Sequence, residues 1–480
     1  MPNSARAALP WRLDPSFNPA AGVSFSGGSP GYPNGLALQE DGHILVWGSF
    51  TRANETPLRS IARFNPDGSL DQSFAADLDG DVNAVAVQPD GKLVIGGNFT
   101  GAVARLNPDG SRDTTFNGPV LRYRPAGGAA TVLALTLQPD GHILVGGIFF
   151  ADDADPSRFS LTRLNADGSV DPAFVGSVDS HDLVNGWLSP GFVSYLAAQT
   201  NGSVLVGGSF VGMNSTNANA PGVITGSFAR IDSTGIPDAA FQAPVFSLVA
   251  VASGSFVDTN SQAVGHLTAL APLADERIVA GWHQGAYDPD VPTDNVFRLT
   301  AMGDRDFDFN VVTLDGGASV TAIAPQLDGS IYIGGGFSGV NGSARPKLAR
   351  LTADGTLDDW MAPNNLGLDV VNGLAAQPDG NLLLLGSFTN AQGTARSSLV
   401  RLQPIPTGLL LSPSLRRGSF SISLVTNAGR SYQLQSIDAF PATNWTLRAT
   451  LTGNGLVQTI SDPNAGPGRR FYRVMETVTP

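Results

Sequence analysis

The amino-acid sequence predicts an all-β protein: a β-propeller of seven four-stranded blades, followed by a small β-sandwich. Three observations predict this fold. The 480 residues include 57 Gly and 33 Pro but only four Glu and two Lys, on which long helices depend. One segment recurs seven times. The half-segment that is missing after the last copy stands at the N-terminus. Repeats of this kind indicate a ring of similar sheets.

The repeat is clearest between Val82 and Phe116, which read VNAVAVQPDGKLVIGGNF, a short gap, and VARLNPDGSRDTTF. Its first half begins again at Gly35, Val132, Val193, Leu267, Val320 and Val371. Each half has two short apolar runs joined by Pro-Asp-Gly, in which Pro presets φ and Gly takes the left-handed turn position. Each copy therefore predicts two β-hairpins, which together make a four-stranded sheet.

The second half of every copy contains an arginine, and in six copies an aspartate follows eight residues later. Counted back from the hairpin loop, this spacing puts the two side chains opposite each other on neighbouring strands. A charge pair there contributes about 0.2–1 kcal/mol. Alternatively, the aspartate caps its own turn by accepting hydrogen bonds from Ser73 or a nearby amide. Both interpretations make these residues structural. The pairs are Arg63 and Asp71, Arg105 and Asp113, Arg163 and Asp171, Arg230 and Asp238, Arg298 and Asp306, and Arg350 and Asp358.

The seventh arginine, Arg401, has no such aspartate after it. The aspartate stands instead near the N-terminus, as Asp14 in the fragment L-D-P-S-F that ends at Phe17. We therefore predict that Asp14 lies opposite Arg401 and that the N-terminal strand closes the ring, because an open propeller would expose a strand edge. Phe17 is then expected to pack as Phe74 does in the first copy.

The repeated pattern V-x-A-[LV]-A-x-Q-P-D-G-K-[IL]-x-[VI]-G-G-x-F, followed by A-R-L-N-x-D-G-S-x-D-x-x-F, resembles the bacterial delta-60 repeat. The resemblance covers about residues 11–402 in seven copies. It implies a propeller within large secreted or surface-attached bacterial proteins, and it implies no catalytic residues. The fifth copy departs most, since Glu276 replaces the turn glycine and Asp306-Phe307-Asp308-Phe309 crowds the end of the motif.

Three regions follow from the repeat: a propeller over 1–402, a proline-containing linker over 403–407 and a β-sandwich over 408–480. The last region alternates polar and apolar residues in five short runs, which predict five strands. It resembles the C-terminal module ending in R-F-Y-R-V that follows repeat regions in exported proteins of the Verrucomicrobia and Planctomycetes type. The matching residues, expected mainly in the core, are Tyr432, Trp445, Asp462, Phe471, Tyr472 and Arg473.

Composition excludes several classes of function. A net charge of −13 is unsuited to nucleic acid, and the lack of cysteine excludes disulfides, thiolate zinc sites and cysteine nucleophiles. No apolar run is long enough to span a membrane, and the first residues lack the apolar region of a signal peptide. Either the chain is cytoplasmic or its leader lies outside this sequence; the family resemblance implies the cell surface or the extracellular space. We expect a monomer.

Few sequence motifs suggest a catalytic, nucleotide-binding or metal-binding site. Gly334–Gly339 matches G-x-G-x-x-G, but no helix pattern follows, so the glycines belong to the repeat. The histidines have no metal-ligand spacing, and His43 and His142 are expected as exposed turn residues. The alternating aspartates Asp77, Asp79 and Asp81 flank a glycine, as oxygen ligands of calcium do, but they lack the bidentate glutamate of an EF-hand. Calcium there is one hypothesis and a solvated acidic loop is the other. We expect no other cofactor.

Both Pro-Asp-Gly loops of a copy emerge on one face of the ring, so the connections of variable length share the other face. Long loops on a rigid scaffold are where binding residues concentrate, although they also drift without function. The candidate ligand-binding residues there are Arg122, Tyr123, Arg124, His181, Trp187, His283 and Tyr287. We expect a non-catalytic binding or scaffold module for a glycan, peptide or protein. The alternative is a polysaccharide hydrolase or lyase with its site at the propeller centre.

Overall fold

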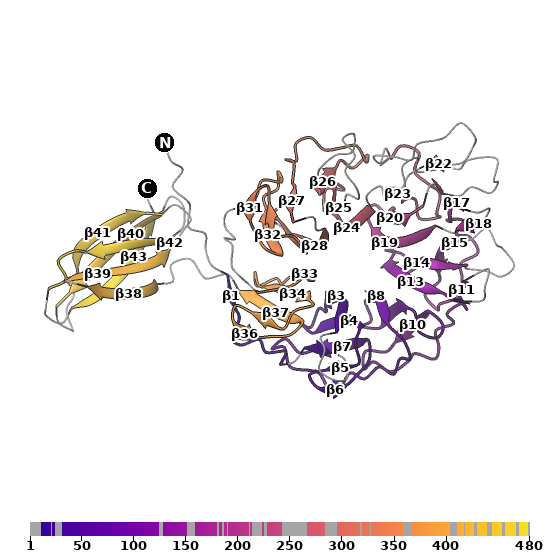
Figure 1. Ribbon diagram of the computed structural model, residues 1–480, viewed down its shortest axis with the longest axis horizontal. Coiled ribbons are helices and arrows are strands. Elements are labelled where there is room, and N and C mark those ends of the chain that lie inside the picture. The colour runs from indigo at the N-terminus through magenta and orange to yellow at the C-terminus, as the bar shows by residue number, and fades with distance from the viewer. Residues whose placement is uncertain are drawn as a thin grey trace. The chain divides into compact units, whose positions relative to one another are not determined.

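The computed structural model is built from β-strands, and no helix occurs among the residues that it describes (Figure 1). These residues are 11–20, 22–24, 31–123, 128–150, 159–179, 182–184, 187–189, 191–210, 212–213, 223–224, 228–241, 266–283, 295–316, 319–326, 328–358, 367–403, 410–416, 418–426, 430–438, 444–453, 457–466 and 470–478. Within them, no helix has the length and apolar character needed to cross a membrane. The chain divides into two compact units, one of 14–357 and 365–401 and one of 1–13, 358–364 and 402–480.

Each repeat copy forms an antiparallel sheet of three main strands. In order, the sheets are β3 (Tyr32–Leu38), β4 (Ile44–Ser49) and β7 (Ile61–Phe64); β8 (Val82–Val87), β9 (Leu93–Gly97) and β10 (Val103–Leu106); β13 (Thr131–Leu137), β14 (Ile143–Phe150) and β15 (Phe159–Leu164); β19 (Phe192–Ala198), β20 (Val204–Ser209) and β23 (Phe228–Ile231); β24 (His266–Pro272), β25 (Ile278–His283) and β26 (Val296–Leu299); β28 (Val320–Pro325), β29 (Ile331–Gly335) and β32 (Leu348–Leu351); and β33 (Val371–Ala376), β34 (Leu382–Gly386) and β37 (Leu399–Gln403). The last sheet also contains β1 (Arg12–Leu13), paired with β37.

The first strand of each copy lies innermost, and the sheets are arranged around a common centre (Figure 1). Each innermost strand contacts the innermost strand of the next copy, and β33 of the last copy contacts β3 of the first. Radial sheets of this kind define a β-propeller, so the predicted all-β propeller class is confirmed.

In six copies, the fourth strand that we expected is reduced to one bridging residue. In the first copy Leu70 pairs with Phe64, and the N–H of Asp71 donates to the carbonyl oxygen of Arg63 at 2.9 Å, the register predicted from the hairpin. Pairing then ends because the carboxylate of Asp71 accepts the N–H of Ser73 at 2.9 Å, which turns the chain out of the sheet. The four-stranded expectation is therefore corrected to three strands and a bridge in these six copies, whereas the sheet of the seventh copy has β1 as its fourth strand.

Small sheets that the sequence analysis did not anticipate involve the connection between the second and third strands, and three of them also contain a short strand that precedes the first strand of the copy. Two of their turns place two successive residues at positive φ, as type I′ hairpins require: 45° and 65° at Asn54 and Glu55, 50° and 74° at Asn341 and Gly342. The sheets are β2 (Val23–Ser24), β5 (Arg52–Ala53) and β6 (Thr56–Pro57); β16 (Val178–Asp179), β21 (Gly212–Met213) and β22 (Val223–Ile224); β27 (Leu314–Asp315), β30 (Gly339–Val340) and β31 (Ser343–Ala344); and β35 (Asn390–Ala391) with β36 (Thr394–Ala395). Two further hairpins are β11 (Arg122–Tyr123) with β12 (Gly128–Ala129), and β17 (Asp182–Val184) with β18 (Trp187–Ser189).

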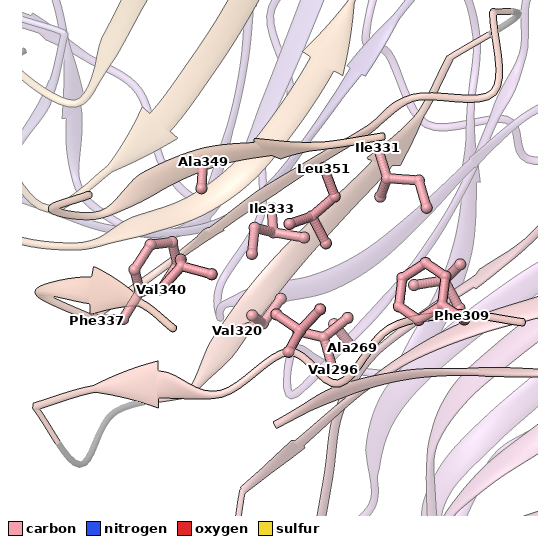
Figure 2. Close-up of a cluster of buried hydrophobic side chains, with 12 residues drawn as sticks. Ala269, Val296, Phe309, Val320, Ile331, Ile333, Phe337, Val340, Ala349 and Leu351 are labelled. Atoms are coloured by element: carbon pink, nitrogen blue, oxygen red, sulfur yellow. The ribbon is translucent and has the colours of Figure 1, made fainter. Parts of the chain in front are cut away.

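The core lies between consecutive sheets. Figure 2 shows one such cluster, in which Ala269 and Val296 of the fifth copy pack with Val320 and Ile333 of the sixth. The repeated glycines permit this approach: a Cβ at Gly96 would lie 2.3 Å from Cγ1 of Val132 in the next copy. These glycines therefore serve packing, consistent with their interpretation as a feature of the repeat.

The described residues after 409 form two three-stranded sheets that share one apolar cluster, which includes Leu424, Tyr432, Leu434 and Ile460. The sequence analysis missed one strand, β38, because its alternation is interrupted by Pro413. That residue falls at a register shift on an edge strand, where proline is tolerated. The strands are β38 (Leu410–Arg416), β39 (Ser419–Val425) and β42 (Val457–Asp462), and β41 (Thr446–Thr452), β40 (Arg430–Ile437) and β43 (Phe471–Val478).

Candidate functional site

The two faces of the propeller carry different kinds of connection. The turn face holds the Asp-Gly hairpin loops, such as 39–43 and 65–69. The variable face holds the connections from the second to the third strand and the entries to each next copy, such as 50–60 and 77–81. These two names are kept below.

On the turn face, the repeated arginine links three groups. In the first copy, Nε of Arg63 donates to Oδ2 of Asp71 at 2.7 Å, and its Nη1 donates to the carbonyl oxygen of Pro108 in the next copy at 2.5 Å. The guanidinium also lies 4.9 Å from the ring centroid of Phe74. One side chain therefore joins its own sheet to the next one.

The same arrangement recurs in the second to fifth copies. The Nε-to-Oδ2 distances are 2.7 Å for Arg105 and Asp113, 2.7 Å for Arg163 and Asp171, 2.9 Å for Arg230 and Asp238, and 2.6 Å for Arg298 and Asp306. The guanidiniums of these four arginines donate to carbonyl oxygens of the next copy at Ala166, Ser233, Ala301 and Ala353. In the sixth copy, Nη2 of Arg350 lies 2.6 Å from Oδ2 of Asp328. Asp358 belongs to the other compact unit, and its pairing with Arg350 stays a prediction.

The repeated aspartate satisfies both arrangements that the sequence left open. Oδ2 of Asp71 accepts Arg63, and Oδ1 accepts the N–H and the hydroxyl of Ser73 at 2.9 and 2.7 Å. Burial alone would raise the pKa of Asp71, but these hydrogen bonds and the charge of Arg63 lower it below its usual 3.8. The carboxylate therefore stays ionised in the folded protein.

His43 and His142 correct a prediction, since both are partly buried and approach aspartates. Nδ1 of His43 lies 2.9 Å from Oδ2 of Asp41, and its Nε2 lies 3.9 Å from Oδ2 of Asp71. His142 approaches Asp140 and Asp171 in the same way. The strand that follows the turn carries the ring back over its own sheet, toward the repeated aspartate. Lys92, at the equivalent position of the second copy, donates to Asp113 at 2.8 Å.

The N-terminal fragment makes these contacts for the last copy. Nε of Arg401 donates to Oδ2 of Asp14 at 2.7 Å, and the N–H of Asp14 donates to the carbonyl oxygen of Arg401 at 2.9 Å. Nη1 of Arg401 reaches the carbonyl oxygen of Pro66 at 2.7 Å. Phe17 is buried in the cluster between the seventh and first copies, and its ring centroid lies 4.7 Å from the Arg401 guanidinium.

A second contact between the last and first copies lies on the variable face. The side-chain amide of Asn372 donates to the carbonyl oxygen of Pro33 at 2.9 Å. Asn83 makes the same bond to Val132 between the second and third copies, at 3.0 Å. In both cases the asparagine occupies the register shift of the innermost strand, where its side chain is free to reach across.

A pocket of about 260 Å³ opens between the first and second copies on the variable face. It combines one guanidinium, two carboxylates, an amide and a hydroxyl over a buried aromatic ring. Its lining residues are Phe50, Thr51, Arg59, Asp79, Gly80, Asp81 and Asn98. The sequence analysis selected Asp79 and Asp81 but missed the other five, because residues so far apart in sequence converge only once two copies pack together.

Hydrogen bonds join the loop over 77–81 to the turn over 98–100 and to Arg59, and they hold the pocket lining in place. The carboxylate of Asp79 accepts both the hydroxyl and the N–H of Thr100, and these bonds lower the pKa of Asp79. The N–H of Asp81 donates to Oδ1 of Asn98 at 2.9 Å. Nη1 of Arg59 lies 3.3 Å from the backbone oxygen of Asp79.

The expected calcium site is not formed as a cluster. Among the residues described, no three His, Asp or Glu side chains are grouped so that they could hold a metal ion. Asp77 is exposed, and both carboxylate oxygens of Asp79 accept hydrogen bonds from Thr100. The calcium hypothesis therefore stays a prediction, to be tested by chelation.

The seven innermost strands contain no Asp, Glu, Lys or Arg and only one histidine, His266. Several of the polar side chains that the structure describes on these strands form hydrogen bonds that link neighbouring copies. The hydroxyl of Tyr195, for example, donates to the carbonyl oxygen of Thr268 in the next copy at 2.6 Å, and burial raises the pKa of Tyr195 to about 12. Two aromatic side chains at the first positions of innermost strands are exposed, Tyr32 at 63% and Phe192 at 36%.

The seven candidate ligand-binding residues are only partly described. Arg122 and Tyr123 lie on β11, which pairs with β12 and, through Arg122, with Phe150 of β14. Trp187 lies on β18 and His283 ends β25, but their side chains are not among those described. Arg124, His181 and Tyr287 lie outside the described residues. Those of the seven that the structure describes are not among the residues that line the pocket.

Comparisons with known proteins agree with the repeat. The family described as "Domain of unknown function (DUF5122) beta-propeller" matches residues 39–74, 88–116, 138–174, 326–359 and 377–404. These five segments fall on the first, second, third, sixth and seventh copies. No curated protein sequence matches the chain.

Solved structures with a similar arrangement have low identity. A catalytically inactive virginiamycin B lyase from Staphylococcus aureus, with quinupristin, is 11% identical, with a TM-score of 0.45 over 82% of this chain and 100% of that one. The extracellular domain of a hybrid two-component system from B. thetaiotaomicron is 11% identical, with a TM-score of 0.44 over 99% of this chain. PorZ, a surface component of the type-IX secretion system of Porphyromonas gingivalis, is 13% identical, with a TM-score of 0.42 over 92%. The chain spans 60% and 56% of the last two.

Proposed function

We propose that this chain is a non-catalytic binding or scaffold module, a propeller that presents its variable face to a glycan, a peptide or another protein. The observation that carries the proposal is a contrast in chemistry. The innermost strands bear no carboxylate or cationic side chain other than His266, whereas a polar pocket with Arg59, Asp79 and Asp81 opens on the variable face. General acid–base catalysis at the centre would need titratable groups there.

The scaffold that we propose is a ring of seven blades closed by the N-terminal segment. Its support is three contacts at the junction of the last copy with the N-terminal segment and the first copy: Asp14 with Arg401, Arg401 with Pro66, and Asn372 with Pro33. The first reproduces the pair found within other copies, and the other two reproduce bonds between consecutive copies. A ring of this kind leaves few unpaired strand edges and holds its loops rigidly.

We propose that the C-terminal module is a β-sandwich. Its support is the apolar cluster shared by the two three-stranded sheets, in which Leu424 and Ile460 belong to one sheet and Tyr432 and Leu434 to the other. Buried Asp462 accepts the hydroxyl of Tyr472 at 2.9 Å. We also propose that the chain is part of an exported, surface-attached protein, because the repeat resembles the delta-60 pattern. We propose that it is a monomer.

The proposal is tested by measuring binding and turnover side by side. The purified chain is applied to a glycan array and a peptide array, and it is incubated with a panel of polysaccharides while reducing ends and unsaturated products are followed. We expect reversible binding to one class of ligand without product formation. Turnover that is lost when His266 is replaced would instead support the hydrolase or lyase.

A further inference from the structure

We propose that the pocket between the first and second copies binds one sugar residue of a neutral glycan; this inference rests on the proposed binding function and names its ligand. The pocket volume of about 260 Å³ lies just below the roughly 300–1,000 Å³ of pockets for drug-sized ligands. It is therefore suited to a single ring-sized group.

The donor and acceptor set of the pocket fits hydroxyl groups. Arg59 supplies N–H donors and Asp81 supplies carboxylate acceptors, while Asn98 and Thr51 add an amide and a hydroxyl. A sugar hydroxyl accepts a hydrogen bond from a guanidinium and donates one to a carboxylate at the same time. Neighbouring hydroxyls on a ring therefore satisfy Arg59 and Asp81 together without bringing a charge into the site.

Arg59 and Asp81 are available for this role. Among the described residues, Arg59 forms no ion pair, and its one hydrogen bond, to the backbone of Asp79, is long at 3.3 Å. Within the same part of the chain, the side chain of Asp81 accepts one long bond, 3.4 Å from the hydroxyl of Ser60. Asp79, in contrast, is committed to Thr100 and shapes the loop.

The charges of the pocket disfavour ionic ligands. A phosphate or carboxylate group would meet Asp79 and Asp81 beside Arg59, and an ammonium group would meet Arg59 beside the two carboxylates. In the first case the ligand is repelled by the two carboxylates, and in the second case it is repelled by the guanidinium. A neutral polyhydroxyl ligand meets no such penalty.

An exposed aromatic ring next to the pocket supplies a surface for the apolar face of a sugar. Tyr32 is 63% exposed and pairs with Ser49, the residue before Phe50 of the pocket lining. Farther along β3, the side-chain amide of Asn34 donates to the backbone oxygen of Val82, the residue after Asp81 of the pocket, at 3.3 Å. Tyr32 therefore lies on the strand that borders the pocket.

The test is an array of immobilised neutral oligosaccharides, probed with the full-length chain and its variants. We expect the wild-type chain to bind a subset of these glycans. Arg59→Ala and Asp81→Asn should each weaken that binding by at least about tenfold, since each truncates a hydrogen bond to a charged group. Tyr32→Ala should weaken it less. Arg396→Ala, on the same face of the seventh copy, is the matched control and should bind within about twofold of wild type.

The outcomes separate this inference from the proposed function. Binding of neutral glycans that survives both Arg59→Ala and Asp81→Asn overturns the pocket assignment and leaves the binding function standing. Binding of charged glycans or peptides alone does the same. No binding to any array overturns both. Thermal melts identify a variant that has unfolded, and Arg59→Lys, which keeps the charge but not the paired donors, then serves as the second test.

Discussion

The turn face and the variable face of the propeller differ in how far the seven copies agree. On the turn face, an arginine, an aspartate and a phenylalanine recur with nearly equal distances, as in Arg63 with Asp71 at 2.7 Å and Arg401 with Asp14 at 2.7 Å. On the variable face, the hairpin over 50–60 has no counterpart in the second copy, where only a short turn joins β9 to β10. The repeated arginine bridge between copies therefore lies on the turn face, and the variation in loop length lies on the other.

This difference between the faces indicates where substitutions should destabilise the fold most. The apolar clusters and the arginine bridges join each sheet to the next, so a change there weakens two copies at once. The loops on the variable face differ in length between copies, and insertions there have a small entropic cost. The comparison is broken if a turn-face change proves harmless or a variable-face change unfolds the ring.

The largest expected effect comes from the aromatic ring that the N-terminal segment inserts between the seventh and first copies. Phe17→Ala should lower the free energy of unfolding by about 3–5 kcal/mol, because a buried ring is replaced by a cavity. Phe74→Ala, at the equivalent internal position, should have the same cost. Denaturant unfolding of both variants checks this. A loss below about 1 kcal/mol for Phe17→Ala alone would mean that the N-terminal segment is dispensable.

The next effect concerns the arginine at the same junction. Arg401→Ala should lower the free energy of unfolding by about 3 kcal/mol, because it leaves buried Asp14 without its cation and removes the bond to Pro66. Arg396→Ala, five residues earlier on the variable face, should stay within about 0.5 kcal/mol of wild type. Equal effects of the two substitutions would contradict the division between the faces.

Sequence reasoning succeeded where the repeat imposes geometry. The spacing of eight between Arg63 and Asp71 and the three-residue loop between them determine the register, and Asp14 was recognisable only because Arg401 lacked a partner. It failed where packing decides. The pocket is lined by residues of two copies, such as Phe50 and Asn98, and no local sequence pattern predicts that these residues lie close together.

Other misses had a readable signal. Asn341-Gly342 is a strong type I′ turn pair, so the hairpin of β30 and β31 was open to prediction from the sequence. Strand β38 was hidden by Pro413, which usually argues against a strand. The prediction that His43 and His142 are exposed was wrong because it ignored the geometry of the hairpin. The residue after the turn glycine points back toward its own sheet, where each histidine approaches the repeated aspartate.

Acid should act mainly on the turn face. The pKa of Asp14 is lowered below its usual 3.8: burial would raise it, but hydrogen bonds from Ser16 and Arg401 outweigh burial. The unfolded chain therefore takes up protons before the folded one does. The stability from such aspartates is present above about pH 4 and is lost as the pH falls through their lower folded values. Urea midpoints should fall from pH 6 to pH 3, and less steeply for Asp14→Asn. An unchanged slope would show that Asp14 is not a contributor.

The smallest expected effect is on the variable face, at Asp79. Its carboxylate accepts the N–H and the hydroxyl of Thr100, so Asp79→Asn should cost about 1 kcal/mol, the usual scale of a turn-capping bond. Because those two oxygens are already occupied, we expect a calcium chelator to leave the Tm of the wild-type chain unchanged, and the variant to melt at the same temperature with and without chelator. Differential scanning calorimetry with added calcium or chelator checks both. If chelator lowers the Tm of the wild-type chain and Asp79→Asn abolishes that response, the aspartates at 77, 79 and 81 bind calcium and the loop is a metal site.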